Sequence, residues 1–456
     1  MRIRALALLV ALVASPCLAQ QAEDQSSVVA AAKEILQKIA AGQFDAVEAR
    51  YTPQMSAALA PGRLASVWAS ILEQEGSFQS IVSATETKAQ SYEVVLLACK
   101  FDKAVIDAQV ALTADGRLGG LRFTPHREPP PPWVAPAYAK PDAFTEQPLT
   151  LVNGKYDLPG TLTLPKGKGP FAAIVLVQGS GPHDQDETIG PNKPLEDLAW
   201  GLATQGIAVY RYTKRTQKYG AQSSDDPAKL TVDDETMSDA RAAVALVAKQ
   251  NGIDSRRVFV AGHSLGAYLA PRIATGDPQI TGIVMLAANT RPMEQLLVDQ
   301  VHYIISSGPA ATADEQKQID MVEANAKKIE SPDLKPGDTV TVLGSEMPAS
   351  YWLDLRDYHP VPVAQALKIP ILIMQGGRDF QVPPATNFDE WKTALAARKN
   401  VTFKLYPALN HIFITGAGPS MPQEYDKPGH VDEQVITDIA SWVSSGGETP
   451  HLSQSR

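Results

Sequence analysis

The segment from Val258 to Ala267 holds a serine between two glycines, in the order Gly262-x-Ser264-x-Gly266. Apolar residues typical of a strand precede it, and residues typical of a helix follow it. A serine on a strained turn between a strand and a helix presents its hydroxyl at the edge of a sheet, and small flanking residues make that turn possible. We therefore interpret Ser264 as a nucleophile rather than as part of an ordinary glycine-rich turn.

A serine hydroxyl attacks well only when a base accepts its proton and an acid orients that base. Both residue types follow Ser264 in the order Asp, then His. Asp379 comes shortly after the buried-strand pattern 371–374, and His411 follows the strand pattern 401–405. His411 is therefore the predicted base, and Asp379 is predicted to hold its imidazole. The alternative is that both are ordinary loop residues.

Acyl transfer also needs backbone N–H groups that bind the oxyanion. Leu265, directly after the serine, can supply one of them. The glycine-rich loop 178–182 can supply the other, and we choose Ser180, with Gly179 and Gly181 as alternatives. A phosphate-binding role for this loop is disfavoured, because no Lys-Ser or Lys-Thr pair follows it.

Predicted strands and helices alternate between residues 145 and 445, which is typical of an α/β fold with a mostly parallel sheet and helices on both faces. The alternation breaks at about residues 290–365, a gap far longer than the usual connections of about 2–6 residues. Loops at the carboxyl ends of the strands surround the ligand crevice in such folds, so we expect a helical cap insertion here. A polar tail is expected over 446–456. The expected strands are 149–152, 160–164, 172–177, 208–212, 258–261, 282–287, 371–374 and 401–405.

Residues 25–125 show a different pattern, with two helical stretches followed by about four strands. This order predicts a small α+β domain. We find no acid, base or metal-binding pattern in it, so a packing or dimerisation module is the expected role, and a homodimer is one possible state. Prolines crowd residues 125–141, which predicts an extended linker over 126–144.

The first residues are typical of a secretory signal peptide. Arg2 and Arg4 precede the apolar run 5–14, and small residues up to Ala19 offer a cleavage site. The apolar run is about half of the roughly 20 residues that a bilayer span needs. We therefore predict a signal peptide over 1–19 and export to the periplasm or the medium, without a stable membrane anchor.

The composition argues against several other functions. With 50 acidic and 41 basic side chains the net charge is −9, and long basic clusters are lacking, so nucleic-acid binding is not expected. Cleavage after Ala19 would leave Cys99 as the only cysteine, in an apolar run where we expect it to be buried. The sequence shows no Cys and His spacing of a metal site, so neither a metal nor a cofactor is expected.

Together, the Ser, Asp and His candidates and the loop 178–181 resemble the α/β-hydrolase superfamily over residues 145–445. The stretch 179–194 looks like exported bacterial esterases that carry a small N-terminal domain, and residues 25–125 resemble NTF2-like domains. The resemblance implies a serine hydrolase that cleaves small carboxylic esters through an acyl-enzyme, without a cofactor. A serine aminopeptidase or oligopeptidase of the same fold is the alternative, and a non-catalytic binding protein is a weaker one.

Two positions depart from the pattern of these esterases. Gln178 stands where many relatives have histidine, and residues 213–216 read Thr-Lys-Arg-Thr where an Asp-Lys-Arg-Gly turn is common. Both segments line the expected crevice, so the substrate preference stays open. Asp184, Asp186 and Glu187 could repel anionic substrates there, but we expect them to be solvated surface charges.

Overall fold

The computed structural model describes residues 27–60, 62–89, 92–126, 131–308, 311–342 and 345–447. The predicted signal peptide lies outside the described residues, as does the predicted tail apart from residues 446 and 447. The chain divides into two compact units, with the boundary between Pro129 and Pro130. No helix of the described residues combines the length and the apolar character that a membrane crossing requires.

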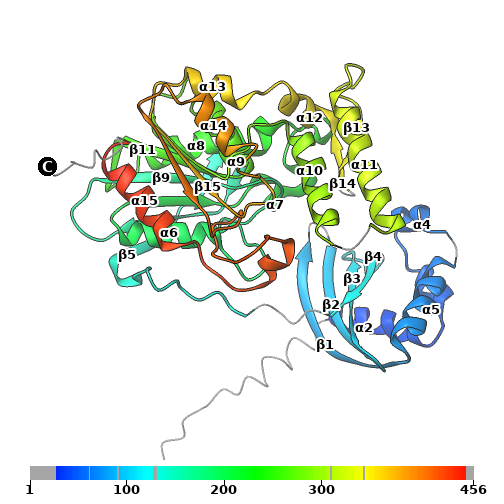
Figure 1. Cartoon of the computed structure of the whole chain (residues 1–456). Coiled ribbons are helices and arrows are strands. Elements are labelled where there is room, and N and C mark those ends of the chain that lie inside the picture. Colours follow the sequence, from blue (N-terminus) through cyan, green and yellow to red (C-terminus); the bar gives the residue numbers. More distant parts are fainter. Residues whose placement is uncertain are drawn as a thin grey trace, which may run out of the picture. The chain divides into compact units, whose positions relative to one another are not determined.

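Helices and one antiparallel sheet form the first unit (Figure 1). Each strand pairs with the next one along the chain, in the order β1-β2-β3-β4. Apolar residues at helical spacing bury one face of α2 in the core of this unit, where Cys99 is also fully buried. This is the small α+β fold that the sequence predicts. Its elements are α2 (Ser27–Ala40), α3 (Phe44–Glu48), α4 (Pro53–Ala58), α5 (Arg63–Glu75), β1 (Phe78–Ala89), β2 (Tyr92–Phe101), β3 (Val105–Leu112) and β4 (Leu118–Pro125).

An eight-stranded sheet organises the second unit, in the order β16-β15-β12-β11-β9-β10-β8-β5. The six strands from β16 to β10 in this order run parallel, and β8 pairs antiparallel with both of its neighbours, β10 and β5. The carboxyl ends of the parallel strands therefore meet at one edge of the sheet. The strands are β5 (Phe144–Pro148), β8 (Gly160–Pro165), β9 (Phe171–Val177), β10 (Ala208–Tyr212), β11 (Ile253–His263), β12 (Ile280–Leu286), β15 (Ile371–Gly376) and β16 (Val401–Tyr406).

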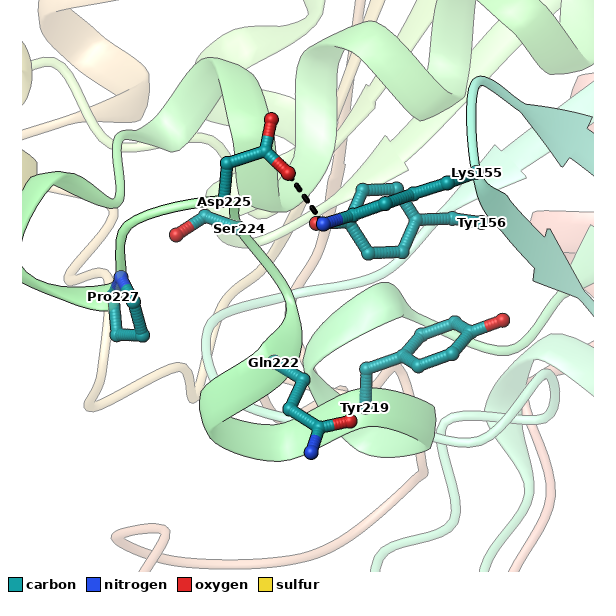
Figure 2. A pocket seen from close by; sticks show the side chains of 7 residues that line it. All are labelled: Lys155, Tyr156, Tyr219, Gln222, Ser224, Asp225 and Pro227. Carbon is teal, nitrogen blue, oxygen red and sulfur yellow. Dashed lines mark hydrogen bonds and ion pairs between the residues drawn. The ribbon is translucent and has the colours of Figure 1, made fainter.

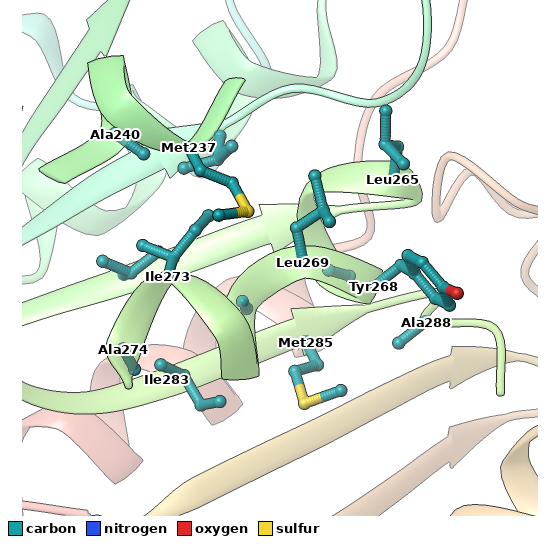
Figure 3. Packing of buried hydrophobic residues seen from close by; sticks show 14 of the residues in the cluster. Met237, Ala240, Leu265, Tyr268, Leu269, Ile273, Ala274, Ile283, Met285 and Ala288 are labelled. Carbon is teal, nitrogen blue, oxygen red and sulfur yellow. The ribbon is translucent and has the colours of Figure 1, made fainter. Parts of the chain in front are cut away.

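Helices cover both faces of this sheet, which confirms the predicted α/β-hydrolase architecture. Alternate side chains of β9 enter two separate apolar cores, because successive residues of a strand point to opposite faces. The helices α8 (Ser238–Val247), α9 (Leu265–Ala274) and α14 (Phe388–Ala394) pack in one core, and α6 (Pro194–Thr204) and α15 (Glu433–Ser444) pack in the other. Figure 3 shows the first core, where side chains of α9 pack over β12.

The segment between β12 and β15 forms helices and a hairpin. Apolar side chains of α11, β13 and α12 join the core that also holds α9, so the segment packs on the second unit rather than extending from it. The stretch after Ser331, which is rich in proline and glycine, contains the hairpin β13–β14. The elements are α10 (Met293–Ser306), α11 (Ala313–Glu330), β13 (Thr339–Val342), β14 (Ser345–Pro348), α12 (Ala349–Arg356) and α13 (Pro360–Ala366).

The start of the second unit differs from the sequence prediction. The edge strand of the sheet is β5, whereas the predicted strand 149–152 overlaps β6 (Leu151–Asn153), which pairs with β7 (Tyr156–Leu158) in a small separate hairpin. Only Phe144 of β5 is buried, so the strand lacks the alternation that reveals strands in a sequence. Before it, Trp133 donates a hydrogen bond to Asp197 at 3.1 Å, which ties the proline-rich segment to α6.

Candidate active site

The predicted nucleophile lies on the turn between β11 and α9. Ser264 has φ 53° and ψ −115°, a conformation that residues other than glycine adopt rarely and at a cost in energy. A Cβ atom on Gly262 would lie 2.2 Å from the backbone of Gly266, and a Cβ on Gly266 would lie 2.4 Å from the Val177 carbonyl oxygen. Both positions therefore require glycine. Ser264 is the one residue of 258–271 that is not buried.

Asp379 and His411 lie in the loops after β15 and β16, and they contact each other. His411 Nδ1 lies 2.8 Å from Asp379 Oδ2, and both residues are 3% exposed. The other carboxylate oxygen accepts hydrogen bonds from the N–H groups of Gln381 and Val382, each at 2.9 Å. These bonds fix the carboxylate, which in turn orients the imidazole. The structure thus brings together the predicted base and its predicted acid.

The loop that carries His411 also contacts the serine turn. The rings of His263 and His411 lie 4.8 Å apart between centroids, and His263 Nε2 lies 3.1 Å from the His411 carbonyl oxygen. His263 directly precedes Ser264, so the predicted base lies beside the serine turn. Because β11, β12, β15 and β16 are neighbours in the sheet, their carboxyl ends bring these loops to the same edge.

The predicted oxyanion donors belong to the serine turn itself and to the loop after β9. A Cβ built on Gly179 would lie 3.2 Å from Ser264 Cβ, so the loop after β9 lies against Ser264. The Gly179 N–H donates to Glu187 Oε1 at 2.8 Å, so this N–H is not free to bind a ligand oxygen. Within the described part of the chain, the N–H groups of Ser180 and Leu265 make no hydrogen bond. Both are therefore available for a ligand oxygen.

A buried ion pair that the sequence did not reveal lies behind the serine turn. Glu187 Oε1 lies 2.9 Å from His263 Nδ1, and the two side chains are 2% and 5% exposed. Since both ring nitrogens of His263 face oxygen acceptors, the ring satisfies both only as a protonated imidazolium. The prediction that Asp186 and Glu187 are solvated surface charges is wrong, because both are buried.

The pKa values agree with this charge assignment. Burial acts to lower the pKa of His263, but the charge and hydrogen bond of Glu187, together with the His411 carbonyl and the Asp379 carboxylate, outweigh it, and the pKa is raised. Burial acts to raise the pKa of Glu187, but the charge and hydrogen bond of His263, together with His183 and the Gly179 N–H, outweigh it, and that pKa is lowered. The sequence contains both residues inside the motifs that predicted the site, yet their pairing across 76 positions has no local signal.

A second buried ion pair contacts the glycine-rich loop 178–182. Lys214 Nζ lies 3.1 Å from Glu235 Oε1, with side chains that are 2% and 5% exposed. Among the described residues, no group of three or more His, Cys, Asp and Glu side chains is placed to hold a metal ion. The groups gathered at this site are a hydroxyl, an imidazole, a carboxylate and backbone N–H groups.

A pocket of about 430 Å³ in the second unit holds none of the predicted site residues (Figure 2). An ion pair between Lys155 and Asp225 spans it, and the ring of Tyr219 lies along one side. Lys155 is largely exposed. We assign this pocket no part in the chemistry.

Comparison with known proteins places the second unit in a family. The family model described as serine aminopeptidase, S33, matches residues 172–415, which is more than half of the chain. The chain belongs to this family of α/β-hydrolases, and it is a hydrolase. A second model, described as a protein of unknown function (DUF3887), matches residues 32–121 of the first unit.

One relative resembles the whole chain. Esterase EstD of Thermotoga maritima is 39% identical over 410 residues, which cover 90% of this chain and 93% of the esterase. Two solved structures are more distant. Est1E from Butyrivibrio proteoclasticus is 14% identical, with a TM-score of 0.42 over 66% of this chain and 98% of that chain. A puromycin-hydrolyzing peptidase of Mycobacterium tuberculosis is 16% identical, with a TM-score of 0.43 over 83% of this chain and 48% of that chain.

Proposed function

We propose that this chain hydrolyses small carboxylic esters through an acyl-enzyme on Ser264. The Ser264 hydroxyl attacks the ester carbonyl while His411 Nε2 accepts its proton, and Asp379 holds the opposite ring nitrogen and stabilises the imidazolium. The N–H groups of Leu265 and Ser180 bind the oxyanion of the tetrahedral intermediate. His411 then protonates the leaving alcohol. A water molecule, activated by the same histidine, releases the acid and restores the serine.

The observation that carries this proposal is the strained turn at Ser264 beside a buried Asp-His pair. A positive φ at a serine costs energy and persists where function uses it. The hydrogen bond between Asp379 and His411 selects the tautomer in which Nε2 is free to accept a proton. Backbone strain of this kind and an imidazole held by a buried carboxylate are features that active sites concentrate. Their adjacency at one edge of the sheet supports nucleophilic catalysis rather than ligand binding alone.

Ester rather than peptide hydrolysis is favoured by how much of this chain each match covers. The aminopeptidase model matches only the second unit, whereas Esterase EstD matches 90% of this chain. The description of the family model still makes peptide hydrolysis a second candidate. The two activities share one mechanism and differ in the leaving group, which is an alcohol in one case and an amine in the other.

Replacement of the nucleophile tests the mechanism and the substrate class together. We expect Ser264→Ala to lower turnover of short p-nitrophenyl esters by about 10³-fold or more. The wild-type enzyme should cleave these esters far faster than aminoacyl p-nitroanilides. Cys99→Ser, a substitution in the core of the first unit, serves as a control with unchanged turnover. Full activity of Ser264→Ala would refute the mechanism, and faster cleavage of the anilides would favour a peptidase.

We also propose that the chain is exported and that residues 1–19 are removed. Support comes from the sequence alone, from the basic start, the apolar run and the small residues before the cleavage site. Mass spectrometry of the protein from a cell fractionation should find a mature N-terminus at Gln20 in the exported fraction. Intact protein in the cytoplasm with Met1 retained would contradict export.

A further inference from the structure

Lys214 is a buried cation whose three ammonium protons are all used. Its Nζ donates to the carbonyl oxygens of Gly179 at 2.7 Å and Gly181 at 3.1 Å, and it pairs with Glu235 at 3.1 Å. The side chain is 2% exposed. Two of its three partners therefore belong to the glycine-rich loop, and they lie on either side of Ser180.

The contact at Gly179 fixes a peptide group that matters for the reaction. The carbonyl of Gly179 and the N–H of Ser180 belong to one planar trans peptide, in which they point in opposite directions. Because Lys214 holds the carbonyl, the Ser180 N–H points away from Lys214 and makes no hydrogen bond within the described residues. The preceding N–H, of Gly179, is held by Glu187. Two buried charges thus hold successive groups of this loop.

The charge on Lys214 also affects the donor strength of this peptide. A cation that binds a carbonyl oxygen polarises the peptide, which strengthens the hydrogen bond that its N–H donates. Glu235 balances the charge and accepts a second hydrogen bond from the Tyr351 hydroxyl at 2.8 Å. Tyr351 belongs to α12 of the segment between β12 and β15. That segment is therefore joined to the glycine-rich loop 178–182 through Glu235 and Lys214.

We propose that Lys214 is a positioning residue that fixes the Ser180 N–H as the second oxyanion donor. The inference rests on the proposed function, and it adds a role for a side chain that touches no substrate. A purely structural role is the alternative, in which loss of Lys214 lowers stability and leaves the catalytic step unchanged. The two differ in what they do to kcat, because only a misplaced oxyanion donor weakens transition-state binding selectively.

The test compares Lys214→Met with Arg215→Met. Arg215 is the neighbouring buried cation. Although the sequence places residues 213–216 at the expected crevice, the Arg215 guanidinium is buried against Asp239 and the Ser223 carbonyl and makes no hydrogen bond to loop 178–182 within the described residues, so its loss matches Lys214 in burial and charge only. We expect Lys214→Met to lower kcat on p-nitrophenyl butyrate by about 10–10²-fold with KM within about twofold, less than the loss of a whole donor. Arg215→Met should keep kcat within about twofold of wild type. If Lys214→Met does not fold, Lys214→Gln is compared with Arg215→Met in its place.

A tetrahedral inhibitor provides the second measurement. A boronic acid forms a tetrahedral adduct with the serine and uses the oxyanion donors, so its inhibition constant should rise by a factor similar to the loss of kcat. Rates are expressed per serine titrated with a fluorophosphonate. Equal kcat values for the Lys214 and Arg215 variants would overturn the inference. Ser264→Ala runs in parallel, and its retained activity would instead overturn the proposed function.

Discussion

The ion pair between Glu187 and His263 gives a prediction whose magnitude depends on pH. Glu187→Gln keeps the shape of the side chain and its acceptor for Gly179, but it removes the counter-charge of a buried imidazolium. Breaking a buried pair by removal of one partner costs about 3–5 kcal/mol. We expect a loss of this size in the free energy of unfolding of the second unit at about pH 6, where His263 is charged in the unfolded chain as well.

The pH dependence follows from the two pKa shifts. In the wild type, the pKa of His263 is raised, so its stabilisation is complete below the unfolded value of about 6.5 and is lost as the pH rises through the folded value. The pKa of Glu187 is lowered, so its stabilisation is complete above its unfolded value and is lost as the pH falls through the folded one. In Glu187→Gln, the buried ring without its partner should become neutral. The contribution of His263 to stability should then increase with pH across about 5.5–7.5, opposite to the wild type.

Urea denaturation followed by tryptophan fluorescence measures this difference. The deficit of Glu187→Gln relative to wild type should be largest near pH 6 and smaller near about pH 8.5. Glu323→Gln is a matched control, because Glu323 pairs with His302 at 3.0 Å on the surface, where such pairs contribute about 0–1 kcal/mol. A Glu187→Gln deficit below about 1 kcal/mol, or one that does not change with pH, would refute the buried imidazolium.

Two further substitutions test how the site is held. Asp379→Asn retains an acceptor for the N–H groups of Gln381 and Val382 but no longer selects the His411 tautomer. The kcat on p-nitrophenyl esters should therefore fall by about 10⁴-fold while the unfolding temperature stays normal. A loss of kcat below about tenfold would contradict the role of Asp379. Gly376→Ala would place a Cβ 2.4 Å from the Asn410 carbonyl oxygen and displace the residue before His411, which should lower kcat by about 10²-fold. Gly308→Ala meets only an ordinary contact of 3.6 Å, and equal kcat for the two glycine variants would show that the His411 loop tolerates the shift.

The parts of the site that could be predicted from sequence are those with local signals. The serine turn combines a buried strand, two required glycines and a helix within ten residues, and each component has a physical cause that acts over short range. Asp379 and His411 follow buried strands. Their order along the chain, together with the rule that active sites gather at the carboxyl ends of parallel strands, was sufficient to choose them as candidates. The alternation of strands and helices likewise predicted the fold.

The parts that could not be predicted depend on long-range pairing of charges or on weak local patterns. Glu187 and His263 pair across 76 positions of the chain, and Lys214 and Glu235 pair across 21. Nothing in the sequence around any of these residues indicates its partner. The edge strand β5 buries only its first residue, and the hairpin β13–β14 lies in a stretch that proline and glycine made look irregular. Tertiary contacts decide each of these cases.

The most direct test of the central claim is the identity of the residue that forms the covalent intermediate. The enzyme is treated with a fluorophosphonate until ester hydrolysis stops, digested, and mapped by tandem mass spectrometry. We predict one phosphonylated residue, Ser264, in proportion to lost activity, and no labelling in Ser264→Ala. Complete inactivation with Ser264 unmodified, or with another serine carrying the label, would contradict the mechanism proposed for this hydrolase.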